Sequence, residues 1–480
     1  MAAGGARTSL LIGLGLALLA CALFWPATGH EFLNLDDDRY VYRNAHLERG
    51  LSPDGLRWAV TTDYEAVWIP ATWLSFMADR QFFGEGPAGF HRTNVLLHAL
   101  NAVLLFLVLR SWTGALWRSA LAAALFAVHP LNVEPVAWVT GRKDVLFMFF
   151  GLGSLVFWIR WLFRRTFVDL VICFLLAALS MMAKPMGVVL PVVMFLMTRW
   201  PAPGGRIDGR KLSIALLPFV LAAIAVAVLA RQTAISGEYG APAYVPVADR
   251  IGRAAVFAAA YLRRILWPSG LCIHYPVDTL HWGWPAMVGS VGLLGGLTVG
   301  AWWARYRAGW FMTGWAWFLL GLVPVLDLVQ GGQQLLSDRY VYLPAIGIFV
   351  ILAWALEWLA RRSWMPPRVP VGAAVVLVAS LAVVSAGQLP TWSDNETVFN
   401  RALAVTTDNH RAHLSLANHY DEAGRQGDAL QHARRAVTIK ESATGYYNLG
   451  NILFRLDRTR QARQAYEDAL RLDPTLARAH

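Results

Sequence analysis

Long runs of hydrophobic residues, separated by short polar segments, extend from the start of the chain to about residue 390. A helix that crosses a bilayer needs about 20 consecutive, predominantly apolar residues, and most of the runs approach or reach that length. The pattern therefore predicts about eleven membrane-spanning helices. They are expected at residues 8–28, 94–109, 119–131, 145–159, 166–183, 185–198, 212–230, 282–304, 308–326, 340–359 and 369–389.

The pattern changes beyond residue 390, where charged residues and alanine alternate with single large apolar positions. Two repeats lie about 33 residues apart, and the second has the spacing of a tetratricopeptide repeat. Its marker residues are Tyr446, Leu449, Gly450, Ala462, Tyr466, Ala469 and Pro474. The predicted fold is all-α: a polytopic membrane helix bundle over residues 1–390, followed by a short α-solenoid of tetratricopeptide repeats over 391–480.

Composition supports this class, since 56% of the residues are hydrophobic and only 15% are charged. These values exclude a disordered chain, and three cysteines are too few for a disulfide scaffold. The net charge is +11, from 42 Lys and Arg against 31 Asp and Glu. In a membrane protein such an excess orients the chain, so we expect no nucleic-acid partner.

The short loops predict the orientation. If the spans alternate, the clusters around Arg110, Arg160, Arg210, Arg305 and Arg361 all fall on one side, which is cytoplasmic by the positive-inside rule. The N-terminus is then cytoplasmic. The first loop, at about 29–93, the polar loops at 129–144 and 327–340, and the repeats lie outside. A bacterial inner membrane with a periplasmic outer face fits this arrangement.

Three adjacent carboxylates stand in the first outer loop: Asp36, Asp37 and Asp38. Such a triplet is also found in solvated turns, where it pairs with a neighbour such as Arg39. A carboxylate at the membrane surface can instead act as a general base toward an attacking hydroxyl. Carboxylate oxygens also suit a divalent cation, Mg or Mn, so an ion is a third interpretation.

Several cations occupy the predicted outer face, against the usual charge bias. They are Arg142 and Lys143, Lys184 at a span boundary, and Arg339. An excess of cations at this depth favours binding of a lipid phosphate. Local pairing of Arg142 and Lys143 with Glu134 or Asp144 is the alternative, and no metal-ligand set is predicted.

Other polar residues on this face are supporting candidates. Asp338 and Tyr340 flank Arg339, although Asp338 also suits the start of a helix. His129 is a weaker candidate. The patterns of nucleotide-binding loops, serine hydrolases and zinc proteases do not occur in the sequence.

The order of these parts resembles the transmembrane-and-tetratricopeptide family of protein O-mannosyltransferase-like proteins, as a bacterial member. The resembling stretches include FLNLDDDRYV (32–41), HPLNVEPVAWVTGRKDVL (129–146), AKPMGVVLP (183–191), YLRRILWP (261–268) and SDRYVYLPAIG (337–347).

The resemblance implies a GT-C type membrane glycosyltransferase that takes a sugar, mannose or another hexose, from a polyprenyl-phosphate donor. The family's acidic pair matches Asp36 and Asp37, which are the expected catalytic residues. Arg142 and Lys143, helped by Lys184 and Arg339, would hold the donor phosphate. The acceptor would be a Ser or Thr hydroxyl of a polypeptide brought by the repeats. No cofactor is required, because a lipid phosphate is already a good leaving group.

Two other classes remain open. A lipid-linked glycan ligase or polymerase would share the topology and the phosphate-binding cations but would use a glycan acceptor. A non-enzymatic, membrane-anchored repeat scaffold would not need the acidic residues.

Overall fold

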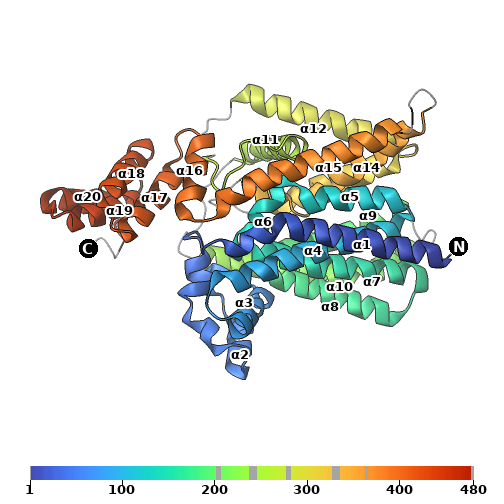
Figure 1. Cartoon of the computed structure of the whole chain (residues 1–480), viewed down its shortest axis with the longest axis horizontal. Coiled ribbons are helices and arrows are strands. Elements are labelled where there is room, and N and C mark those ends of the chain that lie inside the picture. Colours follow the sequence, from blue (N-terminus) through green and yellow to red (C-terminus); the bar gives the residue numbers. More distant parts are fainter. Residues whose placement is uncertain are drawn as a thin grey trace.

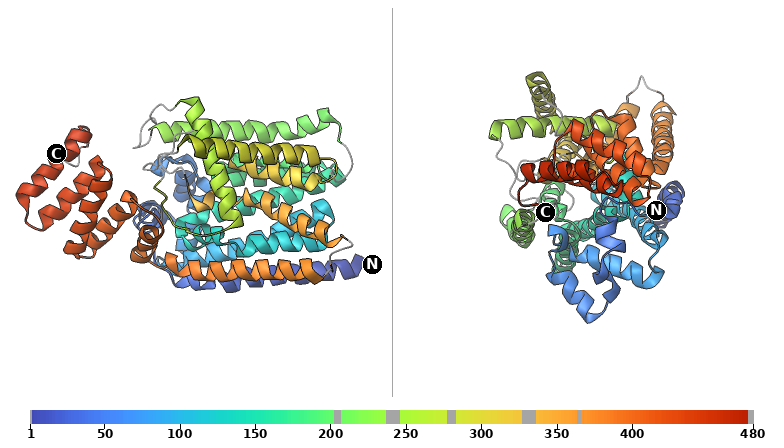
Figure 2. Two further views of the ribbon diagram at one scale, coloured as in Figure 1. Left: turned by 90° about the horizontal axis from the view of Figure 1, so that it is seen from above. Right: turned by 90° about the vertical axis from the view of Figure 1, so that its left-hand side faces the viewer.

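A computed structural model of the chain describes residues 2–201, 207–236, 246–276, 283–326, 336–362, 366 and 368–476 (Figure 1). Within these ranges all regular structure is helical, as predicted. Most helices lie roughly side by side in one elongated bundle, and a smaller group of short helices, ending near the C-terminus, extends from one end of it (Figures 1 and 2).

Six described helices are long and apolar enough to cross a membrane. Their core elements are α1 (Ala2–Phe24), α4 (Pro87–Thr113), α7 (Arg142–Arg164), α10 (Gly209–Ser236), α12 (Trp284–Ala304) and α15 (Arg368–Gln388).

Shorter apolar helices complete the bundle. Four of them are α8 (Phe167–Ala183), α9 (Leu190–Met197) with the preceding turn η7 (Pro185–Val189), α13 (Gly309–Leu322) and α14 (Ala345–Ala360). A further pair, α5 (Leu116–Val128) and α6 (Val133–Ala137), is bent by 53° at the break between them. The long helices, the short ones and this bent pair correspond one by one to the eleven predicted spans.

The bend between α5 and α6 corrects one prediction. The segment 129–144 was expected to be an exposed outer loop, but it forms η5 (Pro130–Asn132), α6 and η6 (Val139–Gly141) before entering α7. Nearly every residue in it is buried. The segment therefore turns back into the bundle and lies beneath the outer surface. The other expected loop, 327–340, is described only from residue 336 onward.

The first outer segment and the repeats lie at the same end of the bundle, and the N-terminus lies at the opposite end (Figures 1 and 2). The first outer segment contains the turns η2 (Asp38–Tyr42) and η3 (Ala45–Arg49) and two helices, α2 (Pro53–Thr61) and α3 (Pro70–Phe83). Helix α2 begins in the usual way, with Ser52 accepting a hydrogen bond from the backbone of Gly55 and proline at the first helical position.

Helix α11 (Val247–Leu266) differs from the spans. It carries arginines along one side and runs at a steep angle to the neighbouring helices (Figure 2). Its buried side includes Phe257, Tyr261 and Arg264. Because this face carries a buried cation, α11 brings a polar group as well as apolar ones to the outer end of the bundle.

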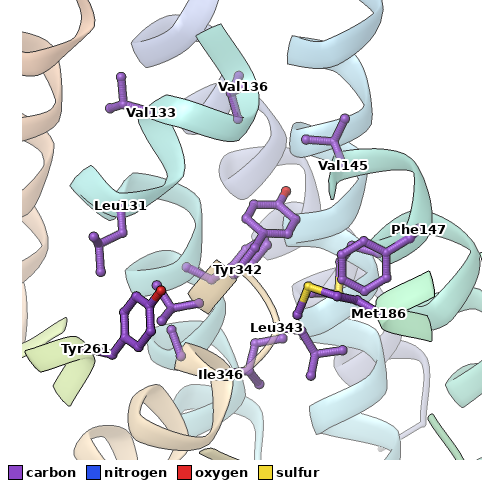
Figure 3. Packing of buried hydrophobic residues seen from close by; sticks show 14 of the residues in the cluster. Leu131, Val133, Val136, Val145, Phe147, Met186, Tyr261, Tyr342, Leu343 and Ile346 are labelled. Atoms are coloured by element: carbon purple, nitrogen blue, oxygen red, sulfur yellow. The ribbon is translucent and has the colours of Figure 1, made fainter. Parts of the chain in front are cut away.

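The core below the outer surface is built from segments far apart in sequence. Figure 3 shows Leu131, Val133 and Val136 in the same buried cluster as Tyr342, with Tyr261 of α11 nearby. The hydroxyl of Tyr342 lies 2.8 Å from Nδ1 of His98, so the polar atom of this buried ring has a partner. Close contact between α13 and α14 depends on Gly314, since a Cβ there would lie 2.4 Å from the carbonyl oxygen of Gly347.

The repeats follow α15 through the turn η10 (Leu389–Trp392). Two helical hairpins, α17 with α18 and α19 with α20, pack in series behind α16. Gly450 allows the last hairpin to close, because a Cβ there would lie 2.5 Å from the ring of Tyr466. The helices are α16 (Asn395–Val405), α17 (His410–Glu422), α18 (Gln426–Ile439), α19 (Ala443–Arg455) and α20 (Thr459–Leu472).

Candidate active site

The acidic triplet separates into different environments. The Asp37 side chain is wholly buried, and its carboxylate accepts hydrogen bonds from the backbone N–H of Leu33 (2.9 Å) and from Thr140. Thr140 donates both its backbone N–H (2.9 Å) and its hydroxyl (2.5 Å). Burial raises the pKa of Asp37 to about 7, although these hydrogen bonds lower it. Asp37 thus joins the first outer loop to the turn before α7.

Asp36 points elsewhere. Its side chain is 39% exposed, and its carboxylate lies 3.7 Å from Nζ of Lys143. The Lys143 ammonium also lies 4.2 Å from the ring centroid of Tyr40 and 5.9 Å from that of Trp138. Asp38 is half-buried at the start of η2 and has no carboxylate hydrogen bond or ion pair among the described residues. Asp36 is therefore the member of the triplet that combines exposure with a cationic partner.

Two more ion pairs adjoin Asp36 and Lys143. Nζ of Lys184 lies 2.5 Å from Asp144 and 5.4 Å from the ring centroid of Tyr340. Arg339 pairs with Glu134 through its guanidinium, and its backbone N–H donates to the same carboxylate at 3.1 Å.

Lys143, Lys184 and Arg339 lie within electrostatic range of one another. Their side chains are each between 12% and 16% exposed. We call these three cations with their three carboxylate partners the outer charge cluster. It brings together the first outer loop, the 129–144 segment, the residue before η7 and the turn before α14. These segments are separated by up to some 300 residues, and the tertiary fold alone brings them together.

Arg142 does not join this cluster. Its side chain is wholly buried, and all three guanidinium nitrogens donate hydrogen bonds inside the protein. The acceptors are Asn94 (2.5 Å), Ser75 (2.6 Å), Asp79 (2.5 Å) and the backbone carbonyl of Phe90 (2.8 Å). The predicted contact between Arg142 and a phosphate therefore needs correction: in this arrangement Arg142 ties α3 and α4 to the start of α7.

The supporting candidates also have structural partners. His129 is buried, with Nε2 2.9 Å from the carbonyl oxygen of Ile265 and Nδ1 accepting from the backbone of Leu131 at 3.2 Å. Both carboxylate oxygens of Asp338 accept from the hydroxyl of Tyr275, at 2.8 and 3.0 Å. Burial raises the pKa of Asp338 to about 7, which Arg264 opposes.

Sequence reasoning missed several residues of this site. Thr140 and Trp138 lie within the stretch 129–146 that carried the resemblance, but nothing in the sequence assigned them a partner. Tyr275 and Arg264 lie in or near the stretch 261–268, and no spacing rule links either to Asp338. A metal site was an open interpretation. Across the described ranges, no group of three or more His, Cys, Asp or Glu side chains is placed to hold a metal ion.

Comparison with known proteins shows which proteins this chain resembles in sequence. A tetratricopeptide repeat model matches residues 443–476. Drosophila melanogaster protein O-mannosyl-transferase Tmtc2 is 28% identical over 282 residues, which are 55% of this chain and 30% of that protein. Human protein O-mannosyl-transferase TMTC4 is 25% identical over 443 residues, which cover 79% of this chain and 58% of that protein. The chain is thus similar in sequence to TMTC protein O-mannosyl-transferases.

Mouse TMTC3, a further TMTC O-mannosyl-transferase, is 22% identical over 454 residues, which cover 85% of this chain and 48% of that protein. The chain thus matches less than two thirds of the length of each of these TMTC relatives. Among solved structures, ArnT from Cupriavidus metallidurans, bound to undecaprenyl phosphate, covers 98% of this chain and 76% of its own. Its TM-score is 0.43 at 15% identity, too distant to compare the sites residue by residue.

Proposed function

We propose that the protein is a membrane glycosyltransferase that moves a sugar from a polyprenyl-phosphate donor to a Ser or Thr hydroxyl of a polypeptide. The sugar is mannose or another hexose, and the reaction takes place on the non-cytoplasmic face of an inner membrane. The observation that carries the proposal is the outer charge cluster. It places an exposed carboxylate beside three cations at the end of the apolar bundle.

The surroundings of the cluster suit such a donor. An isoprenoid tail is apolar and would lie among the spanning helices, while its phosphate would stay at the end of the bundle. The faces of Tyr40, Trp138 and Tyr340 lie next to the cations. Tyr40 and Trp138 are buried, whereas Tyr340 is partly exposed and offers a flat surface for a sugar ring. A phosphate could be reached by Lys143, Lys184 and Arg339, whose side chains are partly exposed.

The chemistry is a single displacement. The acceptor hydroxyl oxygen attacks the anomeric carbon, and the bond between that carbon and the phosphate oxygen breaks. The bonding electrons leave with the phosphate, where Lys143, Lys184 and Arg339 stabilise the added negative charge. Asp36 takes the hydroxyl proton. Because the displacement is single, the configuration at the anomeric carbon inverts.

The ion pair between Asp36 and Lys143 explains how the base becomes available. At 3.7 Å it is the longest pair of the cluster, and it is partly exposed to solvent. A donor phosphate that attracts the Lys143 ammonium would weaken the pair. Asp36 would then lose its positive neighbour and be free to accept the hydroxyl proton.

Asp37, Arg142 and Glu134 serve as positioning residues in this proposal. Each is buried and holds one segment of the site against another through hydrogen bonds or an ion pair. The repeats would deliver the acceptor polypeptide, because they contact the acidic loop directly. The backbone N–H of Asn34 donates to Asn395 at 2.6 Å, and its side-chain amide donates to Glu422 of α17 at 2.8 Å.

The test is a transfer assay with the purified protein in lipid nanodiscs. Polyprenyl-phosphate-linked mannose and a second hexose serve as donors, and a Ser/Thr-rich polypeptide is the acceptor. Mass spectrometry measures hexose addition. Asp36→Asn should reduce the rate by about 10²–10⁴-fold, the usual contribution of a general base. Asp38→Asn, which removes a neighbouring carboxylate with no described partner, should leave the rate within a few-fold.

The other outcomes identify the alternatives. Transfer only to a lipid-linked glycan acceptor would make the protein a ligase or polymerase. Absence of transfer to any acceptor, together with normal cellular function of Asp36→Asn, would point to a non-enzymatic scaffold.

A further inference from the structure

One buried cation beside the outer charge cluster has guanidinium nitrogens without a hydrogen-bond acceptor among the described residues. Arg264, near the end of α11, is only 7% exposed, and its Nε and Nη1 atoms are buried with no hydrogen-bond acceptor within the described part of the chain. Five donors make arginine costly to bury without acceptors, and a charge in a medium of low polarity raises that cost. Buried polar groups are nearly always hydrogen-bonded, so an unsatisfied buried guanidinium is a candidate for binding water or an anion.

The packing around Arg264 holds it in place without neutralising it. Its guanidinium carbon lies 4.0 Å from the ring centroid of Tyr275, a stacked cation–π arrangement. The nearby carboxylate, Asp338, shares the hydroxyl proton of Tyr275 between its two oxygens, at 2.8 and 3.0 Å. No ion pair within 4 Å joins Arg264 to Asp338. Burial also raises the pKa of Asp338 to about 7, which weakens it as a counter-ion at neutral pH.

The position of Arg264 connects it to the outer charge cluster. Tyr261, one turn earlier on the same side of α11, accepts a hydrogen bond from the backbone of Ser337 at 3.1 Å. Ser337 in turn donates its hydroxyl to Glu134, the partner of Arg339. Arg264 therefore lies close to the segment 337–339, and both Arg264 and Arg339 act on the charge of Asp338.

Charge balance separates Arg264 from the cluster cations. Lys143, Lys184 and Arg339 each have their own carboxylate, so the outer charge cluster is neutral before any ligand binds. Among the described residues Arg264 has no carboxylate within 4 Å, and Asp338, with which it interacts at longer range, also faces Arg339 and Glu134. An anion that enters the site can therefore contact Arg264 without displacing a carboxylate that is bound directly to it.

We propose that Arg264 binds a phosphate group, and that this phosphate belongs to the polyprenyl donor. This inference rests on the proposed function for the source of the phosphate. The guanidinium needs acceptors for two separate nitrogens, and a phosphate offers several oxygens at once. In transfer, Arg264 would stabilise the charge that builds up on the leaving phosphate.

Binding measurements test the proposal without requiring sugar transfer. The full chain in nanodiscs is titrated with undecaprenyl phosphate, with undecaprenol, which lacks the phosphate, and with inorganic phosphate. Arg264→Gln is compared with Arg263→Gln, the same charge change at the adjacent, exposed position. Loss of one charge-assisted interaction should lower the affinity for undecaprenyl phosphate by about tenfold or more, and only in the Arg264→Gln protein. Undecaprenol should bind equally to all three proteins.

Thermal unfolding of the ligand-free proteins gives a second readout. Because Arg264→Gln removes a buried charge without a partner, its melting temperature should equal or exceed that of the wild type. Unchanged affinity of a folded Arg264→Gln protein for undecaprenyl phosphate would overturn the proposal. So would a large loss of ligand-free stability, since it would show a structural role. Weaker binding of inorganic phosphate alone would keep the anion site but overturn its lipid source.

The two proposals can fail separately. If transfer is absent but Arg264→Gln lowers the affinity for undecaprenyl phosphate, the binding site stands and the glycosyltransferase proposal falls. If transfer occurs with equal donor affinity in both proteins, Arg264 is not part of the site.

Discussion

The carboxylate of Asp37 accepts two hydrogen bonds from Thr140, one from the backbone at 2.9 Å and one from the hydroxyl at 2.5 Å. The two residues are 103 positions apart, and both lie in buried surroundings. This contact fixes the first outer loop against the turn that leads into α7. It therefore sets the distance between Asp36, one residue before, and Lys143, three residues after.

Substitution of Thr140 tests this link. Thr140→Val keeps the shape and the backbone hydrogen bond but removes the hydroxyl, so Asp37 loses one donor. A hydrogen bond to a charged or partly charged group contributes about 1–3 kcal/mol, and we expect a loss of that size in thermal unfolding. Transfer should also fall, because the acidic loop loosens. Thr140→Ser retains the hydroxyl and should behave like the wild type; equal losses in both variants would contradict the prediction.

The raised pKa of Asp37 predicts a pH dependence of stability. Its folded-state pKa of about 7 exceeds the value of about 3.9 in an unfolded chain. Between these pH values the folded state holds more protons than the unfolded state. The contribution of Asp37 to the free energy of unfolding is therefore complete below about pH 4 and is lost as the pH rises to about 7. The slope cannot exceed about 1.4 kcal/mol per pH unit for one proton.

Asp37→Asn should remove this component, because an amide does not titrate. Between pH 5 and pH 8 the melting temperature of the wild type should therefore fall relative to that of Asp37→Asn. Parallel pH profiles for the two proteins would show that Asp37 is not the titrating group.

Substitutions of the adjacent cations Arg142 and Lys143 should affect different properties of the protein. Arg142→Gln breaks a buried ion pair with Asp79 and leaves that carboxylate unpaired, which costs about 3–5 kcal/mol. Lys143→Gln removes a partly exposed cation and should change stability by less than about 1 kcal/mol, while weakening undecaprenyl phosphate binding.

Thermal unfolding and lipid titration of both variants measure these effects. A stable Arg142→Gln protein with reduced lipid affinity would restore the original prediction that Arg142 holds the phosphate.

A histidine pair in the repeats predicts sensitivity to acid. Nδ1 of His413 on α17 lies 3.0 Å from Nδ1 of His432 on α18, so one ring must stay neutral to accept. Burial lowers the pKa of His413 to about 4, with His432 and Arg435 acting in the same direction. Burial also lowers the pKa of His432, against the opposing charge of Asp428.

Since both folded-state values lie below the unfolded one, the stabilisation is present above about pH 6.5 and decreases as the pH falls toward 4. Hydrogen exchange of the full chain, corrected for intrinsic rates, should show α17 and α18 losing protection between pH 7 and pH 5. The His413→Gln protein should lose less exchange protection over this pH range than the wild type. His419→Gln, on the same helix, serves as the control. Equal loss in all three proteins would exclude the pair.

The sequence predicted the fold more completely than the site. Eleven spans and a repeat tail follow from periodic patterns, because each helix needs a continuous apolar stretch and each repeat needs small residues at set spacings. The bent pair α5 and α6 was not predicted. A buried polar segment such as 129–144 resembles a loop when its tertiary partners are unknown.

For the site, the sequence by itself selected the chemical groups. It identified Asp36 in an acidic triplet, and Lys143, Lys184 and Arg339 as cations that run against the usual charge bias. Only the tertiary structure decided which of them meet, that Asp37 and Arg142 point inward, and that Arg264 adds a buried cation with nitrogens unsatisfied among the described residues. The physical reason is that the cost of a charge depends on its burial and its neighbours. Those neighbours come from segments hundreds of residues apart, which local patterns cannot connect.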